Sequence, residues 1–320
     1  MFHRGPNLGI VLELPTTFVV KCLITSETKD GNMARRMVLP LLLVTLLCAR
    51  PCAAQSSTVG YWRFEEGSPG AVASGTGTIL DSSGNGNNGT PENGPTYSTN
   101  VPTSTIPQTG ASNHLSMLFN GTNQQIFIPD DPSLALTQSL TLEAYIDPLS
   151  VSSISGSPTD SQTIVFRGDT RDGYDPYKLD MNHGNLVFEI NNASNDQVVV
   201  EVPFDAVNQW TEVAGTLNNA TGVMDLYENG DLVATTTTSI RPFATLESDK
   251  DPGLGIGNVE AADNEYFDGY IDEVRISDQA LSPSQFLSDV VPEPVSLGIV
   301  CGGFLVMLAR PGRMRKSKED

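Results

Sequence analysis

Acidic residues come closer to a catalytic pattern than any other residues of this chain. Hydrolysis of a glycosidic bond with retention needs two carboxyl groups roughly 5 Å apart. Glu247-Ser248-Asp249-Lys250-Asp251 has alternating acids, but Pro252 follows and no apolar residues alternate with them, which predicts a loop. Asp272 and Glu273 are adjacent, so on a strand they face opposite sides, and Arg275 is the expected ion-pair partner of one of them. Neither stretch predicts a catalytic pair.

Nucleophilic chemistry finds no better support. Between residues 55 and 289 the histidines are His114 and His183, and no Gly-x-Ser-x-Gly elbow accompanies them. His183 lies in Asn182-His183-Gly184-Asn185, which predicts a solvated hairpin turn. A zinc site needs more nitrogen or sulfur ligands than these. We therefore expect a protein that is not an enzyme.

Calcium is the cofactor that the sequence favours. The loop from Asp81 to Gly89 offers a carboxylate, side-chain amides such as that of Asn85, and backbone carbonyls freed by glycines. These oxygen ligands suit Ca²⁺. The alternative is a plain Asx turn, in which Asp81 accepts hydrogen bonds from its own backbone. Asp169, Asp172 and Asp175, around Tyr174, form a second and weaker candidate.

Aromatic side chains in loops are the candidates for ligand contact, because sugars stack on exposed rings. Tyr174, Tyr177, Tyr266 and Phe267 lie in or next to predicted loops. Trp62 and Trp210 occupy stretches with apolar alternation, which predicts that they belong to the core.

The elements that position these residues are predicted to be short strands, because β-branched and aromatic residues alternate between turns rich in Gly, Pro, Asn and Asp. Asn229-Gly230 predicts a tight hairpin. Residues 282–287, opened by Ser282-Pro283, predict a short helix, and residues 67–107 predict one long surface connection with a short strand at Ile79-Leu80-Asp81. The predicted strands are 59–64, 114–119, 125–128, 140–146, 163–166, 177–181, 186–190, 197–202, 211–216, 223–228, 231–236, 253–256 and 270–276.

Several short motifs together resemble the laminin-G-like, concanavalin A-like jelly rolls of bacterial surface proteins. The motifs are Tyr61-Trp62-Arg63-Phe64-Glu65-Glu66-Gly67, the Asp81–Gly89 loop, Leu118-Phe119-Asn120-Gly121, Ile128-Pro129-Asp130, Ser139-Leu140-Thr141-Leu142-Glu143-Ala144-Tyr145, Gln209-Trp210-Thr211-Glu212-Val213-Ala214, Leu226-Tyr227-Glu228-Asn229-Gly230 and Phe267-Asp268-Gly269-Tyr270-Ile271-Asp272-Glu273-Val274-Arg275-Ile276. The resemblance covers nearly all of residues 58–289.

This resemblance implies an all-β fold, a two-sheet antiparallel jelly-roll sandwich with the last strand, near Ile271, beside the first, near Trp62. It also implies structural calcium, and the neighbouring strands add Asp272 to Asp81 and Asn85 as candidate ligands. Folds of this kind host lectins, adhesins, carbohydrate-binding modules and some glycoside hydrolases, so function must be judged from sites.

The N-terminal region predicts a secretory signal peptide. Arg35-Arg36 precede an apolar run from Met37 to Cys48, and Cys52-Ala53-Ala54 supplies small residues before Gln55. We expect cleavage after Ala54 and export through the Sec pathway. Residues 1–54 are thus leader and signal peptide, with Met33 or Met37 as the true start, or with a genuinely long leader.

The C-terminal region, residues 290–320, resembles the PEP-CTERM sorting signal of Gram-negative bacteria that make extracellular polysaccharide. Pro292-Glu293-Pro294 precedes a short apolar run, 295–309, and a basic cluster that begins at Arg310. The run is shorter than the roughly 20 residues of a comfortable membrane span. The resemblance implies transient membrane anchoring and cleavage by an exosortase-type enzyme near Pro292 to Pro294. The alternative is a simple tail anchor.

Residues 55–289, the predicted jelly-roll domain, are strongly acidic. There, thirty-two Asp and Glu side chains outnumber seven Lys and Arg side chains by 25. Such charge disfavours nucleic acid and anionic membranes as partners. The four cysteines are Cys22, Cys48, Cys52 and Cys301, all outside this range, so the domain must fold without disulfides.

Together these observations predict an exported protein of the cell surface, outer envelope or extracellular matrix, which binds carbohydrate or another surface component without catalysis. A purely structural matrix protein is the first alternative. A glycoside hydrolase of concanavalin A-like fold is the second.

Overall fold

The computed structural model describes residues 58–151, 161–171, 173–258 and 265–288. Every described residue belongs to one compact unit, within residues 53–320. The predicted signal peptide and the sorting segment 290–320 lie outside the described residues. Within the described residues, no helix is long and apolar enough to cross a membrane.

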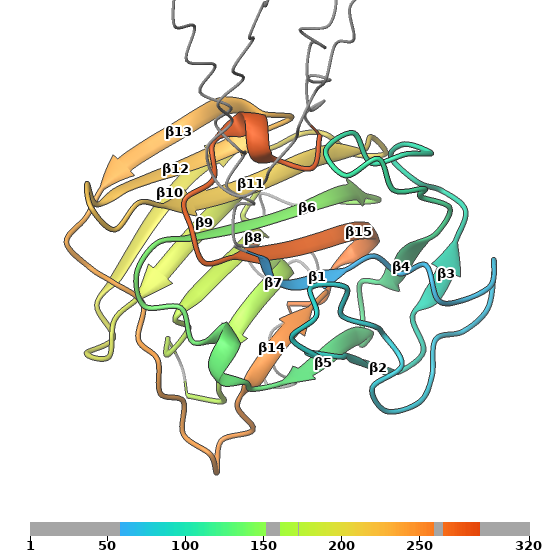
Figure 1. Cartoon of the computed structure of the whole chain (residues 1–320), viewed down its shortest axis with the longest axis horizontal. Coiled ribbons are helices and arrows are strands. Elements are labelled where there is room, and N and C mark those ends of the chain that lie inside the picture. The colour runs from blue at the N-terminus through green and yellow to red at the C-terminus, as the bar shows by residue number, and fades with distance from the viewer. Residues whose placement is uncertain (1–57, 152–160, 172, 259–264, 289–320) are drawn as a thin grey trace, which may run out of the picture. The chain divides into compact units, whose positions relative to one another are not determined.

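Two antiparallel sheets form the domain, as the sequence predicts (Figure 1). The large sheet has the order β13-β12-β11-β6-β15-β4-β3, with β1 paired to β15 off this path, and the small sheet has the order β10-β9-β8-β7-β14-β5-β2. The large sheet comprises β1 (Thr58–Trp62), β3 (Thr96–Ser98), β4 (Ser116–Asn120), β6 (Leu140–Pro148), β11 (Thr211–Leu217), β12 (Val223–Glu228), β13 (Asp231–Thr237) and β15 (Asp268–Ser277). The small sheet comprises β2 (Thr90–Glu92), β5 (Gln125–Pro129), β7 (Ser161–Gly168), β8 (Tyr177–Asn182), β9 (Asn185–Asn191), β10 (Gln197–Pro203) and β14 (Gly253–Ile256).

Alternation along each strand builds the core between the sheets. On β6, Leu142, Ala144 and Ile146 belong to the main apolar cluster, and the residues between them point to the other face. Glu143 and Tyr145 on that outer face are nevertheless buried. The large sheet is therefore covered on both of its faces along β6.

The first and last strands pair as predicted. Trp62 lies opposite Val274 and Tyr61 opposite Arg275, so β1 runs antiparallel to β15 (Figure 1). Trp62 is fully buried in the core and its Nε1–H donates to Asn87 O at 2.8 Å. The prediction for Trp62 is confirmed.

The stretch from residue 67 to 107 contains more structure than its composition suggests. It supplies β2 and β3, and bridges join Trp62 to Asp81 and Ile79 to Gly89. The expectation of a single surface connection is wrong, because strands of three residues carry too few apolar positions to show a period.

Two hairpin turns were predicted correctly, since both central residues have positive φ in Asn229-Gly230 (51° and 80°) and in His183-Gly184 (50° and 81°).

The C-terminal segment (residues 281–288) covers part of the outer face of the large sheet. Its only regular element is a 3₁₀ turn, η2 (Pro283–Gln285), which is shorter than the predicted helix and lies beside β11 in Figure 1. Leu281 and Phe286 pack against Ala214 and Tyr227. Leu287 joins a separate outer cluster with Tyr61, Ile106 and Tyr145, against which Trp210 packs.

Buried carboxyl groups fasten this segment to the sheet. Glu143 Oε1 accepts hydrogen bonds from Leu287 N at 3.2 Å and pairs with Arg275 Nη2 at 2.8 Å. Glu212 accepts from Ser288 N at 3.1 Å and from the Ser288 hydroxyl. Burial raises the pKa of Glu143 to about 7, although Arg275 acts in the opposite direction.

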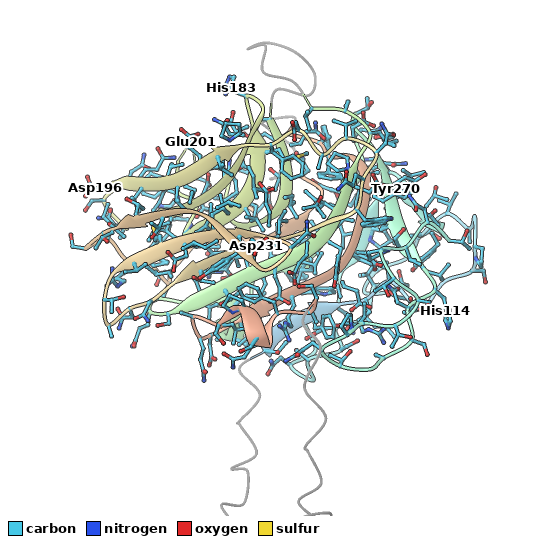
Figure 2. All side chains as sticks on the ribbon, turned by 90° about the horizontal axis from the view of Figure 1, so that it is seen from above. His114, His183, Asp196, Glu201, Asp231 and Tyr270 are labelled. Carbon is cyan, nitrogen blue, oxygen red and sulfur yellow. The ribbon has the colours of Figure 1, made fainter. Side chains whose placement is uncertain are left out.

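Stability should consequently fall as the pH rises. Between pH 4.5 and about 7 the folded Glu143 keeps a proton that the unfolded chain has lost, so its contribution is present at low pH and disappears through pH 7. Measured by urea unfolding, the free energy of unfolding of the wild type should fall by roughly 2–3 kcal/mol more between pH 5 and 8 than that of Glu143→Gln. Glu201→Gln, at an exposed site on β10 (Figure 2), is the control. An equally steep decline in both variants would contradict this role for Glu143.

Candidate functional site

A cluster at the end of the small sheet combines an aromatic ring with charged groups. We call it the Tyr174 cluster: Asp169, Arg171, Tyr174, Phe243 and Glu247. The Arg171 guanidinium lies 4.2 Å from the centre of the Tyr174 ring, and Phe243 meets that ring edge-on at 6.1 Å and 86°. Tyr174 is half-buried, so the residue keeps some contact with solvent. The loop between β7 and β8 thus meets the loop between β13 and β14 around one tyrosine.

Buried anchors hold this cluster in place. The buried Asp169 carboxyl accepts from Arg171 Nε at 2.7 Å, from Arg171 Nη2 at 2.6 Å and from Glu247 N at 2.9 Å. Burial acts to raise the pKa of Asp169, but these hydrogen bonds outweigh it and hold the pKa below its ordinary value. Arg171 Nη1 also pairs with Glu247 at 3.0 Å.

The buried side chain of Arg167 fixes the loop that carries Phe243. Arg167 is fully buried, pairs with Asp130 at 2.8 Å and donates to Ala244 O at 2.8 Å. A ring held by a guanidinium on a fixed loop loses little conformational entropy on binding. The Tyr174 cluster can therefore offer a stacking surface with charged hydrogen-bonding groups at its edge.

The other predicted aromatic contacts lie elsewhere. Tyr177 and Phe267 are fully buried in the core, and the Tyr177 hydroxyl donates to Leu134 O at 2.8 Å. Tyr266 is only 9% exposed. The expectation of exposed rings at Tyr177 and Phe267 is wrong, because alternation on β8 turns Tyr177 inward and Phe267, just before β15, packs between the sheets.

Trp210 departs from its prediction in the opposite sense. It directly precedes β11, is half-buried, and packs on the outer cluster of Tyr61, Ile106, Tyr145 and Leu287. The sequence predicted a core position because apolar residues alternate in the strand that follows it. Instead the indole lies on the outer face of the large sheet.

Asp81 forms the Asx-type turn that the sequence left as the alternative to a calcium site. Its carboxylate accepts from Tyr61 N at 3.0 Å, Ser83 N and Oγ at 2.8 Å each, and Asn87 N at 3.0 Å. Asn85 Nδ2 donates to Val59 O at 3.0 Å. Protein donors thus contact both Asp81 oxygens, which fits the Asx-turn alternative for Asp81, while the prediction for Asn85 remains a prediction.

Asp272, the third predicted ligand, is fully buried and has a different partner. Its Oδ2 accepts from Asn113 Nδ2 at 2.8 Å, and both Asp272 Oδ1 and Asn113 Oδ1 are buried without a hydrogen-bond partner. Burial and the neighbouring Glu273 carboxylate raise the pKa of Asp272 well above its ordinary range. These two oxygens fit a cation but fall short of the six to eight that calcium takes. The described residues contain no group of three or more His, Cys, Asp or Glu side chains that could hold a metal ion.

The ion pairs of the adjacent acids correct another prediction. Arg275 pairs with Glu143, whereas Glu273 accepts from Arg63 at 3.0 Å and from the Tyr61 hydroxyl. The register of β15 against β6 shifts between Asp272 and Arg275, and Glu273 has a φ of 51°. This bulge turns Glu273 toward β1, so simple strand alternation fails there.

A buried polar cluster on β8 was not foreseen from the sequence. Lys178 Nζ lies 3.3 Å from Asp180 Oδ2 and 3.2 Å from Glu265 Oε2, and Thr163 Oγ1 donates to the same Glu265 oxygen at 3.0 Å. Burial acts to lower the pKa of Lys178, but the carboxylates outweigh it and raise the pKa. Burial raises the pKa of Asp180. The i, i+2 spacing of Lys178 and Asp180 was the available signal, since it places both on one face of a strand. Both acids contact the same ammonium group.

Comparison with known proteins identifies the family. Residues 119–286, just over half of the chain, match the Laminin_G_3 family model, described as the concanavalin A-like lectin/glucanases superfamily. The chain belongs to this family. A search of curated proteins finds no match.

Solved structures share the fold at low sequence identity. The binding domain of Paraclostridial Mosquitocidal Protein 1 is 16% identical with a TM-score of 0.50, over 68% of this chain and 50% of that one. Domain 4 of AbnA, a GH43 extracellular arabinanase from Geobacillus stearothermophilus in complex with arabinotriose, is 19% identical with a TM-score of 0.49, over 73% of this chain and 97% of that one. The botulinum neurotoxin serotype D ligand-binding domain in complex with N-acetylneuraminic acid is 16% identical with a TM-score of 0.48, over 77% of this chain and 51% of that one. This chain thus spans about half the length of the toxin domains. Likeness at this level concerns the fold.

Replacing Lys178 by methionine should destabilise the domain by about 3–5 kcal/mol, because Asp180 would stay buried without its ammonium partner. Adding Asp180→Leu should recover most of that loss, since an apolar pair needs no compensation. Lys250→Met, in the loop before β14, removes the same charge as a control. Chemical denaturation measures all three variants. A change below about 1 kcal/mol for Lys178→Met would show that Asp180 does not depend on Lys178.

Proposed function

We propose that this protein binds carbohydrate without catalysis and that the Tyr174 cluster is a contact site. The observation that carries the proposal is the partly exposed Tyr174, held between Arg171 and Phe243 in a domain of the concanavalin A-like lectin/glucanase superfamily. The apolar face of a sugar ring stacks on tyrosine, while the Arg171 and Glu247 side chains can exchange hydrogen bonds with sugar hydroxyls. Because acidic residues greatly outnumber basic ones, neutral sugars are the favoured class.

The absence of catalysis is part of the proposal. Its support is that each of the acids that the structure brings together contacts a basic side chain: Glu273 contacts Arg63, Glu143 contacts Arg275, and Asp180 and Glu265 contact Lys178. A retaining hydrolase requires one carboxylate free to attack and one acid free to donate a proton. The glycoside hydrolase alternative predicts turnover, and the structural matrix alternative predicts no saturable binding.

Cellular location also belongs to the proposal. We infer export through the Sec pathway, transient anchoring through residues 295–309, cleavage by an exosortase-type enzyme, and display among extracellular polysaccharide of a Gram-negative bacterium. The supporting feature is the order of Pro292-Glu293-Pro294, apolar run and basic cluster. Calcium remains part of the proposal through Asp272, whose buried Oδ1 has no hydrogen-bond partner and would be satisfied by a cation or by a proton.

Binding should be saturable on an array of neutral glycans. Tyr174→Ala should weaken it about tenfold through loss of stacking, and Tyr174→Phe should retain it because the ring remains. Leu232→Ala, at an exposed apolar residue of β13, is the control. The array is read in calcium and again in chelator, and a loss of binding in chelator would connect a metal to the site. An absence of binding both in calcium and in chelator would favour the structural matrix alternative.

The processing prediction concerns the two ends of the mature chain. In an exosortase-containing host, mass spectrometry of the surface fraction should show a mature protein that begins at Gln55 and lacks the residues beyond about Pro294. Replacing Pro292-Glu293-Pro294 by three alanines should leave the tail in place. A wild-type surface protein that still ends at Asp320 would support the tail-anchor alternative.

A further inference from the structure

Three residues form a row across the outer face of the large sheet, where the last residues of β6 pair with the first residues of β15. Tyr270 on β15 lies directly opposite Asp147 on β6, and Trp210 immediately precedes β11, the other neighbour of β6. The row belongs to the large sheet, whereas the Tyr174 loop connects β7 and β8 of the small sheet.

The aromatic rings of this row form a pair. The centres of the Trp210 and Tyr270 rings lie 6.2 Å apart with an interplanar angle of 46°, and both side chains are half-buried. Figure 2 labels Tyr270 to the right of His183, in the β8–β9 turn, and of Glu201 on β10. Packing on the outer cluster holds Trp210 in place, and both residues of the pair remain partly exposed to solvent.

Hydrogen bonds orient a polar group beside the rings. Trp210 Nε1–H donates to Asn100 Oδ1 at 3.0 Å, and Asn100 Nδ2 donates to Asp147 Oδ2 at 3.0 Å. Asp147 is only 6% exposed, yet its Oδ1 has no hydrogen-bond partner. Because buried acceptors are nearly always satisfied in native proteins, we expect this oxygen to accept a hydrogen bond from a water molecule or a ligand hydroxyl, or to carry a proton itself.

We propose that Trp210, Tyr270 and Asp147 form a second carbohydrate contact, distinct from the Tyr174 cluster. The C–H face of a neutral pyranose stacks on the two rings, and a sugar hydroxyl donates to Asp147 Oδ1. An acidic sugar is disfavoured, since its carboxylate would meet the Asp147 carboxyl. The choice of carbohydrate as the ligand rests on the proposed function, but this site uses different residues on a different sheet.

Two contacts on different sheets give one molecule two attachment points for a polysaccharide. A protein of this kind can join two chains, or hold one chain more tightly than either site alone, because the second contact becomes intramolecular. With two sites the protein cross-links a soluble neutral polysaccharide, and with one site it binds without cross-linking.

The chain provides its own probe of this site. It has two tryptophans, of which Trp62 is fully buried and Trp210 half-buried, so acrylamide quenching of tryptophan fluorescence reports mainly on Trp210. The probes are neutral oligosaccharides, namely hexasaccharides of β-glucan, xylan, mannan and arabinan, added to the full-length protein. At least one of them should protect Trp210 from quenching in a saturable manner.

Variants separate this site from the Tyr174 cluster. Tyr270→Leu keeps the volume but removes the ring, and it should weaken protection about tenfold. Asp147→Asn should also weaken it by removing an acceptor oxygen. Tyr174→Ala should leave the protection unchanged, and Trp210→Phe gives the background signal of Trp62. Thermal unfolding checks that each variant remains folded, and a misfolded Tyr270→Leu would be replaced by Tyr270→Thr, which also removes the ring and suits a strand position.

Three results would overturn the second contact. The first is array binding through Tyr174 while no oligosaccharide protects Trp210, which leaves the proposed function intact. The second is protection that disappears in Tyr174→Ala, which makes it an indirect effect. The third is protection that is equal in wild type, Tyr270→Leu and Asp147→Asn. If neither the array nor quenching detects binding, both proposals fail.

Discussion

Strand β15 is the element on which the rest of the structure depends, because three strands from distant parts of the chain pair with it. Its neighbours are β6, β4 and β1, and the pairing brings together residues near positions 60, 118, 145 and 270. The inner face of β15 contributes Ile271, Val274 and Ile276 to the core. Most of the large sheet therefore cannot close until almost the whole domain has been made, a non-local pairing that is expected to fold slowly.

The same strand organises an unusual amount of buried charge. The bulge between Asp272 and Arg275 directs three ionisable side chains to the side of the sheet opposite the main core. There Glu273 meets Arg63, Arg275 meets Glu143, and Asp272 meets Asn113. Such groups stabilise a fold weakly, but they make its geometry specific, because each one needs its own partner. Tyr270, which pairs with Trp210, begins this run of outward-facing side chains, so the second proposed contact also depends on the placement of β15.

Much of the fold could be predicted from the sequence, whereas little of the site could. Alternation predicted the long strands, and Asn229-Gly230 and His183-Gly184 predicted their turns, because both signals are local. The strands β2 and β3 were missed because three residues cannot show a period. The exposure of Tyr177 and Trp210 was misjudged because it depends on which elements cover them. The partners of Arg275 and Glu273 were misjudged because a bulge reverses the alternation that the prediction used. Long-range contacts, such as Arg171 with Glu247 or Trp210 with Asn100, have no signal in a single sequence.

Carbohydrate binding by the folded domain is the central claim, and native affinity electrophoresis tests it most directly. The formal net charge of −20 gives the protein high mobility in a native gel, so retardation by an embedded polymer is easily seen. We predict that at least one neutral polysaccharide cast into the gel will slow the protein in proportion to its concentration, and that free oligosaccharide will reverse the effect. Unchanged mobility in every neutral polysaccharide, with an intact fold, would contradict carbohydrate binding and favour a structural role in the matrix.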